Sequence, residues 1–177
     1  SMAGSAKLGE ARQVEEKRRL TEVYRLELAR SGDILVDAAL ARRAMGDLDT
    51  SRRHARALDA RIEELLRIAP DLPDAYYYRG RMLRVELRDE EAELALTQAL
   101  ALAEGSGAST ESAALAPKIR LHRAMVRYRL YCALLGRRRD DWLRGRHGVL
   151  GALQAPPPIP APSRLAALWP ELESARL

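Results

Sequence analysis

Arginines recur through the second half of this chain at spacings that place several guanidinium groups on one helix face. Arg120, Arg123 and Arg127 follow one another at steps of three and four residues, which bring side chains to the same side of an α-helix. A row of guanidinium groups binds carboxylates or phosphates through paired hydrogen bonds. The first chemistry that the sequence suggests is therefore capture of an anionic partner.

Charge is unevenly distributed along the chain, although the net charge is only +5. Residues 118–147 contain ten basic and two acidic residues, whereas residues 86–111 contain seven acidic residues and one arginine. Some of these charges are expected to form salt bridges between neighbouring helices. The remainder would create a positive field that speeds the capture of an acidic partner.

The basic region 118–147 also allows a second interpretation, nucleic-acid binding. Tyr128, Tyr131 and Trp142 are interleaved with its arginines, and aromatic rings beside cations stack on bases while the cations contact phosphates. The acidic region lies close by in the sequence, and no nucleic-acid recognition motif is present. We therefore treat nucleic-acid binding as the alternative.

Catalytic and metal-binding patterns are missing from the sequence. It contains no phosphate-binding loop, dinucleotide fingerprint or zinc-ligand spacing. The histidines are widely separated, and Cys132 is the single cysteine, so an internal disulfide is excluded. The adjacent acids Glu63-Glu64 and Glu90-Glu91 diverge if helical, which is typical of surface charge. We expect no enzymatic activity, no cofactor and no metal.

The composition predicts an all-helical protein. The 177 residues are 47% hydrophobic and 31% charged, which is typical of a globular chain. Alanine and leucine supply the apolar residues, phenylalanine is absent, and no alternating strand pattern appears. No run of 18 apolar residues occurs, so we expect no membrane span. These features favour helices that pack closely through small side chains.

The most structured pattern lies between Pro70 and Leu102. Asp71-Leu72-Pro73 is typical of a helix start, and Asp89-Glu90-Glu91 places negative charge at the start of a second helix. Small residues recur at Ala75, Gly80, Ala92 and Ala99, and Ala92, Leu96 and Ala99 share one helix face. A glycine inside a helix costs about 1 kcal/mol, so we expect a neighbouring helix to approach Gly80.

This stretch resembles one tetratricopeptide (TPR) repeat, a helix-turn-helix unit of about 34 residues. Gly80, Ala92 and Ala99 stand where that motif has small residues, and Tyr76 takes the place of its first aromatic. Arg79 departs from the motif because it stands where a leucine is usual. The resemblance covers residues 70–104 and implies a right-handed α-solenoid of about three helix pairs. It also implies a scaffold, adaptor, chaperone or assembly factor.

Weaker helix pairs are predicted on either side. A charged helix over residues 7–30 is expected to break at Ser31-Gly32-Asp33, followed by a helix from Ile34 to Met45. After Gly46, Asp47 or Asp49 would cap a long helix to Ala69. A third pair is expected over residues 111–135 and 138–153, with a turn at Gly136.

The TPR resemblance also implies which residues would contact a partner, since the first helices of TPR proteins line the concave surface. Carried over position by position, it indicates a groove whose partner-binding residues are Tyr77, Arg81, Arg84, Arg123, Arg127 and Arg43, with Asp33 and Asp37 beside them. Such a groove would favour an acidic or carboxylate-bearing segment of a protein or peptide. Of the consecutive tyrosines 76–78, we expect one or two in the core and one in the groove, because successive helical residues diverge by about 100°.

The two ends of the chain are expected to lie outside the helix pairs. Residues 1–5 resemble an expression remnant, and a helical domain is predicted over residues 6–154. Residues 155–162 form a Pro-rich connector. Ser163 would then cap a short amphipathic helix within residues 163–177, which carries Leu165, Leu168 and Trp169 and which Pro170 shortens or kinks. We expect it to cover an exposed end of the repeat. A cytoplasmic location is expected, and homo-oligomerisation through the terminal helices is compatible with this organisation.

Overall fold

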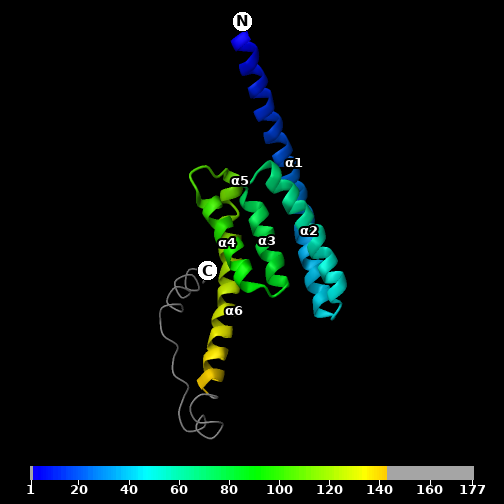
Figure 1. Ribbon diagram of the computed structural model, residues 1–177, viewed down its shortest axis with the longest axis vertical. Coiled ribbons are helices and arrows are strands. Elements are labelled where there is room, and N and C mark those ends of the chain that lie inside the picture. Colours follow the sequence, from blue (N-terminus) through cyan, green and yellow to red (C-terminus); the bar gives the residue numbers. More distant parts are fainter. Residues whose placement is uncertain (1, 143–177) are drawn as a thin grey trace. The chain divides into compact units, whose positions relative to one another are not determined.

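A computed structural model describes the backbone of residues 2–142 and the side chains of residues 7–136. Over these residues every regular element is an α-helix, which confirms the predicted all-helical class (Figure 1). The helices are α1 (Met2–Ala44), α2 (Leu48–Ile68), α3 (Pro73–Val85), α4 (Asp89–Glu104), α5 (Thr110–Ala113) and α6 (Ala116–Trp142).

The chain divides by its internal packing into two units, Ser1–Ile119 and Arg120–Leu177. The boundary lies within α6, so it falls inside the predicted helical domain of residues 6–154. Within the first unit α1 packs against α2, α3 packs against α4, and α1 also lies beside α3. The first part of α1 extends beyond the other helices of this unit (Figure 1).

Helix α1 runs unbroken through Ser31-Gly32-Asp33, so the predicted break there is wrong. A glycine is needed at position 32 because another helix packs closely against it. A Cβ added to this glycine would lie 2.6 Å from the ring carbons Cδ1 and Cε1 of Tyr78, a residue of α3. The Tyr78 hydroxyl also donates to the Ala29 carbonyl of α1, at 3.3 Å. Gly32 therefore permits the close approach of α3 to α1.

The two polar residues beside Gly32 also have partners that suit a helix. The Ser31 hydroxyl donates to the Glu27 carbonyl one turn earlier, at 2.8 Å, an arrangement that satisfies serine within a helix. Asp33 accepts a hydrogen bond from Arg81 of α3. Each member of the expected break is thus accommodated without ending the helix.

The turn between α1 and α2 combines a helix C-terminal motif with an N-cap. Gly46 has a φ of 82°, in the left-handed region that glycine adopts readily. Its N–H donates to the Arg43 carbonyl at 3.0 Å, and the Asp47 N–H donates to the Arg42 carbonyl at 2.9 Å, the pattern of a Schellman motif. Asp47 also accepts from the Thr50 N–H at 3.1 Å. The predicted role of Asp47 as the cap of the next helix is confirmed.

The turn between α3 and α4 repeats this pattern 41 positions later. Leu87 replaces Gly46 and has a φ of 63°. Its N–H donates to the Arg84 carbonyl at 3.1 Å, and the Arg88 N–H donates to the Leu83 carbonyl at 2.9 Å. The predicted starts of α3 at Pro73 and of α4 at Asp89 are confirmed. The first unit therefore contains two helical hairpins with the same turn.

Leu87 provides a test of this turn equivalence. A non-glycine residue in the left-handed region costs about 1 kcal/mol, and the Leu87 side chain is exposed, so its removal forfeits little packing. We expect Leu87→Gly to raise the free energy of unfolding by about 0.5–1 kcal/mol. Gly46→Ala should lower it by a similar amount, as chemical denaturation would measure. Destabilisation by Leu87→Gly would contradict the assignment of this turn.

Helix α2 presents one buried stripe to the rest of the first unit. The buried residues follow steps of four and three: Ser51, Ala55, Leu58, Ile62 and Leu65. This spacing is that of an amphipathic helix with its apolar side in the core. The buried Ser51 hydroxyl donates a hydrogen bond to the Ala39 carbonyl of α1 at 2.8 Å. α2 is thereby fixed against α1.

In the second hairpin, Gly80 plays the role that the sequence predicted. A Cβ at this position would lie 2.5 Å from Cγ of Leu96, and Leu96 is fully buried on α4. Ala92 and Ala99 are also fully buried on the same side of α4. The small residues thus allow α3 and α4 to approach closely, as expected.

The predicted third hairpin is wrong over the described residues. Helix α6 continues through Gly136 to Trp142 instead of turning there, and only the short α5 precedes it. A single glycine weakens a helix by about 1 kcal/mol; its helix-forming neighbours Ala133, Leu134 and Leu135 offset that cost. The predicted connector 155–162, the C-terminal helix 163–177 and the end of the 138–153 helix lie outside the described residues.

Candidate functional site

The side of α3 that was predicted to line the groove is built around Arg81. Its guanidinium carbon lies 5.4 Å from the ring centroid of Tyr77 and 5.5 Å from that of Tyr78. The two rings meet edge to face, with centroids 5.1 Å apart. These contacts hold the arginine in place through cation–π attraction. Tyr77 and Tyr78 are buried and Tyr76 is half-buried.

Arg81 forms an ion pair with Asp33, which joins α3 to α1. The Arg81 side chain is only 12% exposed. Burial lowers the pKa of Arg81, but the hydrogen bond that Arg81 donates to Asp33 and the nearby tyrosines outweigh burial and leave the pKa above its ordinary value. Burial has the opposite effect on the neighbouring phenol and raises the pKa of Tyr77. A carboxylate from a partner would have to compete with Asp33 for this guanidinium.

The structure brings together only some of the sequence-predicted contact residues. Tyr77 and Arg81 touch, but the burial of Tyr77 leaves a partner little of its ring to contact. Arg84 lies one turn further along α3, and Arg43 lies at the end of α1; both are half-buried. The remaining two, Arg123 and Arg127, are half-buried on α6 beyond Ile119 and belong to the second unit. That Arg123 and Arg127 line the same groove as the α3 residues stays a prediction.

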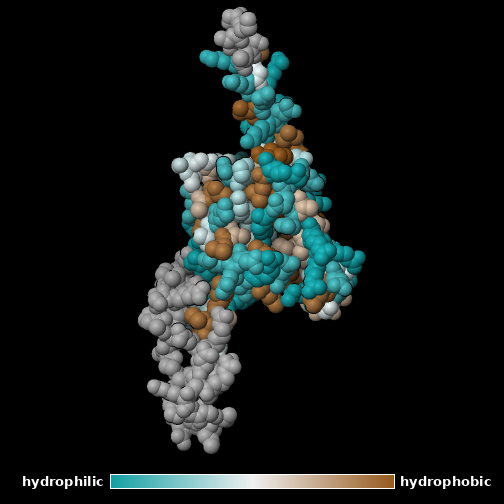
Figure 2. Space-filling model, viewed as in Figure 1, coloured by the Kyte–Doolittle hydropathy of each residue, from teal (hydrophilic) through white to brown (hydrophobic). Residues whose placement is uncertain are grey.

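Exposed apolar side chains accompany the charged residues of α1. Leu26 and Leu40 are 54% and 52% exposed and stand seven residues before and after Asp33, so they lie on the same side of the helix. Ile34 is 65% exposed. In Figure 2 hydrophobic residues form separate patches on a largely hydrophilic face. We call the surface formed by Leu26, Asp33, Asp37, Leu40, Arg81 and Arg84 the α1–α3 surface.

A buried ion pair also joins α1 to α3. The Asp74 side chain is 3% exposed, and its Oδ1 lies 3.6 Å from Nη1 of Arg25. Arg25 also donates two hydrogen bonds to Glu22, at 2.9 and 2.7 Å. Burial outweighs the attraction of Arg25 and raises the pKa of Asp74. The Oδ2 atom of Asp74 has no hydrogen-bond partner, which makes Arg25 its main electrostatic support.

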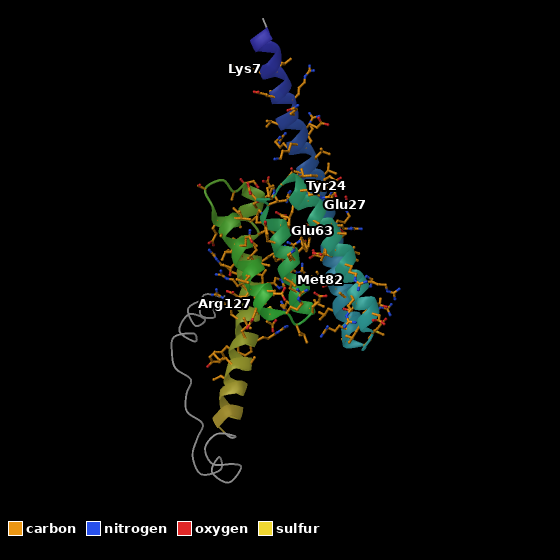
Figure 3. The ribbon with its side chains drawn as sticks, in the orientation of Figure 1. Lys7, Tyr24, Glu27, Glu63, Met82 and Arg127 are labelled. Carbon is orange, nitrogen blue, oxygen red and sulfur yellow. The ribbon has the colours of Figure 1, made fainter. Side chains whose placement is uncertain are left out.

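A concave feature lies between α2 and α3. It encloses about 400 Å³, has Leu58, Ile62 and Met82 in its lining, and carries a charged rim. Figure 3 shows Glu63 on α2 and Met82 on α3 at this place. Arg79 and Arg81 are two residues apart and so point to opposite sides of α3. This pocket therefore lies on the other side of α3 from the α1–α3 surface.

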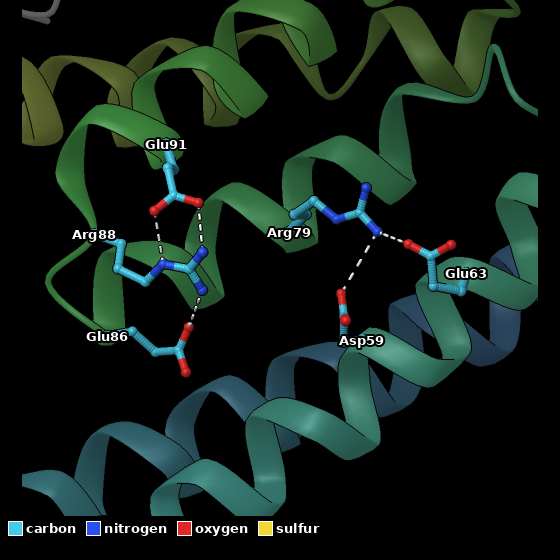
Figure 4. A network of polar contacts seen from close by, with 6 residues as sticks. All are labelled: Asp59, Glu63, Arg79, Glu86, Arg88 and Glu91. Carbon is cyan, nitrogen blue, oxygen red and sulfur yellow. Dashed lines mark hydrogen bonds and ion pairs between the residues drawn. The ribbon is translucent and has the colours of Figure 1, made fainter.

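Ion pairs occupy the rim of this pocket (Figure 4). Arg79 of α3 forms ion pairs with Asp59, at 3.5 Å, and with Glu63, both on α2. Arg88 binds Glu86 at 3.4 Å and also Glu91. The signal for this site was present in the sequence, since Arg79 stands where the TPR motif has a leucine. An arginine here serves to bridge two hairpins electrostatically.

The described residues contain no arrangement suited to metal chemistry or membrane crossing. Within residues 7–136 no three His, Cys, Asp or Glu side chains come together as a metal site would require. Among the helices of residues 2–142, none combines the length and the hydropathy that a bilayer span demands.

Comparison with known proteins gave no match: no family model, no curated protein and no solved structure is similar to this chain.

Proposed function

We propose that the chain is a non-catalytic helical scaffold that binds a segment of another protein along the α1–α3 surface. The observation that carries the proposal is the repeated hairpin. Two helix pairs share one turn geometry at a separation of 41 residues, and their first helices lie side by side. Stacked helix pairs of this kind present extended surfaces that suit peptide binding.

The TPR-like, right-handed solenoid belongs to this proposal. Adjacent first helices, small residues at the close approaches and a shared turn support it. The separation of 41 residues exceeds the TPR period of about 34 by about two helical turns. The 21-residue α2 is longer than the 16-residue α4, and this difference accounts for much of the extra length. The scaffold would therefore be a variant of that architecture.

The surface chemistry favours an amphipathic partner segment with acidic residues. Leu26 and Leu40 offer apolar contacts that a helix or an extended peptide buries. Arg84 and Arg43 place one guanidinium group on each hairpin, and Arg81 forms an ion pair with Asp33. Affinity would come from the leucines, and preference for acidic residues from the two arginines.

The proposal predicts the outcome of a peptide selection. Displayed random 16-residue peptides should yield binders that combine acidic and large apolar residues, with dissociation constants of about 1–100 μM at 150 mM salt. Binding would be measured by fluorescence anisotropy with synthetic peptides. Enrichment of basic peptides, or of none, would contradict the proposal.

A nucleic-acid binding experiment distinguishes the scaffold from the alternative function. A labelled 20-base-pair duplex and a single-stranded oligonucleotide should show no binding by the full chain at 150 mM salt. Binding that weakens steeply as salt rises is the signature of phosphate contacts. That result would favour nucleic-acid binding through the basic region 118–147 over the scaffold.

A further inference from the structure

Helix α6 carries an exposed apolar stripe in the second unit. Leu121, Met125 and Tyr128 are 51%, 42% and 55% exposed, and Cys132 is also exposed. Their spacing of four, three and four residues places them on one side of the helix. Val126, on the other side, is fully buried. We call these four residues the α6 stripe.

A helix with a packed side and a second apolar side is typical of an internal element, because both sides lose contact with water in such a place. Cys132 stands one helical turn after Tyr128 along the stripe, and its proximity raises the pKa of Tyr128. The stripe therefore has the length and the chemistry of a helix-packing face.

We propose that residues 163–177 of the same chain pack onto the α6 stripe. Leu165, Leu168 and Trp169 are spaced as one face of a short amphipathic helix, which Pro170 would end or kink. These three large apolar side chains would pack on the α6 stripe. This inference concerns the second unit and is independent of the proposed peptide binding.

The length of the intervening chain permits this packing. Twenty residues, 143–162, separate Trp142 from Ser163, and they can span up to about 66 Å when extended. The distance back along α6 from Trp142 to Leu121 is about 32 Å at 1.5 Å per residue. Such a tether gives an effective concentration of about 1 mM, which favours the chain's own segment over a second copy.

Charge also favours this occupant. Residues 120–136 contain four arginines and no acidic residue. Residues 143–177 contain two acidic residues, Glu171 and Glu173, and both belong to the proposed segment. A segment that carries acids beside its apolar residues complements an arginine-rich helix.

The single cysteine makes the proposal directly testable, because Cys132 lies in the stripe and no other thiol is present. The rate of thiol modification by dithionitrobenzoate would be measured on the full-length chain. We expect Leu168→Glu/Trp169→Glu to raise this rate about tenfold or more, since thiol reactivity follows exposure. The control is Ala167→Glu, which lies on the opposite side of the predicted helix and should leave the rate unchanged.

Two readings decide the outcome. Equal rates in the wild-type, double and control variants would overturn the proposal. Protection of Cys132 from modification that grows with protein concentration between 5 and 200 μM would also overturn it, because a second copy would then cover the stripe.

As an independent check, Leu168→Cys should form an intramolecular disulfide with Cys132 under mild oxidation, seen as a loss of two mass units in a monomer. Failure to form it would contradict the packing.

Discussion

Replacing Arg25 by methionine should lower the free energy of unfolding by about 3 kcal/mol at pH 7. Methionine keeps much of the volume of the side chain but removes the charge that faces Asp74, which is 3% exposed. Breaking a buried ion pair from one side costs about 3–5 kcal/mol because the remaining charge is left without compensation. The lower value applies here since Arg25 is partly exposed and shares its charge with Glu22.

The loss caused by Arg25→Met should shrink as the pH falls. The pKa of Asp74 is already raised by burial, and loss of Arg25 raises it further. An acid whose folded-state pKa exceeds its unfolded value of about 3.9 favours folding most below that value. Protonation of Asp74 between pH 7 and about 4.5 would therefore recover stability relative to the wild-type protein. Urea denaturation at both pH values measures the difference.

A neutral partner provides the matched control. In Arg25→Met/Asp74→Asn no charge remains buried, so at least half of the lost stability should return at pH 7. The pH dependence specific to the single variant should also disappear. If Arg25→Met is as stable as the wild-type protein, to within about 0.5 kcal/mol, the pair does not support the burial of Asp74.

The second large effect is expected at the contact between α3 and α4. Leu96→Ala should lower the free energy of unfolding by about 2–5 kcal/mol, because Leu96 is fully buried and its loss leaves a cavity. The control is Leu94→Ala on the same helix. Leu94 is 68% exposed, so this change should alter stability by less than about 0.5 kcal/mol. Thermal or urea denaturation gives both values.

Gly80 should couple to Leu96 with a change of sign. Gly80→Ala alone places a methyl group 2.5 Å from Cγ of Leu96, and overpacking of about 1–3 kcal/mol should exceed the gain of about 1 kcal/mol in helix propensity. In the Leu96→Ala background the methyl group has room, so the same substitution should stabilise. A double-mutant cycle measures this coupling. Additive effects would show that Gly80 and Leu96 do not pack as described.

Helix boundaries set by local chemistry could be predicted from the sequence. Asp47 caps α2 through its own side chain, Pro73 occupies the first turn of α3, and Asp89 begins α4. Each signal acts over three or four residues, which is the range that sequence patterns describe well. The pairing of Gly80 with α4 could also be predicted because the partner helix follows immediately.

Features that depend on distant residues could not be predicted. Gly32 indicated a helix break because the residues around it give no other reason for a glycine. The actual reason is the close approach of Tyr78, 46 positions later. The Arg25–Asp74 pair spans 49 positions, and Asp74 had an adequate local explanation as an acid at a helix start. Likewise, the sequence did not indicate that Arg81, which was predicted to line a groove, pairs with Asp33, 48 positions earlier.

The most direct test of the proposed scaffold is whether a selected acidic peptide binds the α1–α3 surface. Its dissociation constant would be compared for the wild-type chain, for Leu40→Glu/Arg84→Glu, and for the control Leu94→Glu/Arg53→Glu, which makes the same changes on α4 and α2. We expect the first variant to weaken binding about tenfold or more, with the control within about twofold. Equal affinity for all three proteins would contradict the proposal that α1 and α3 form the binding surface.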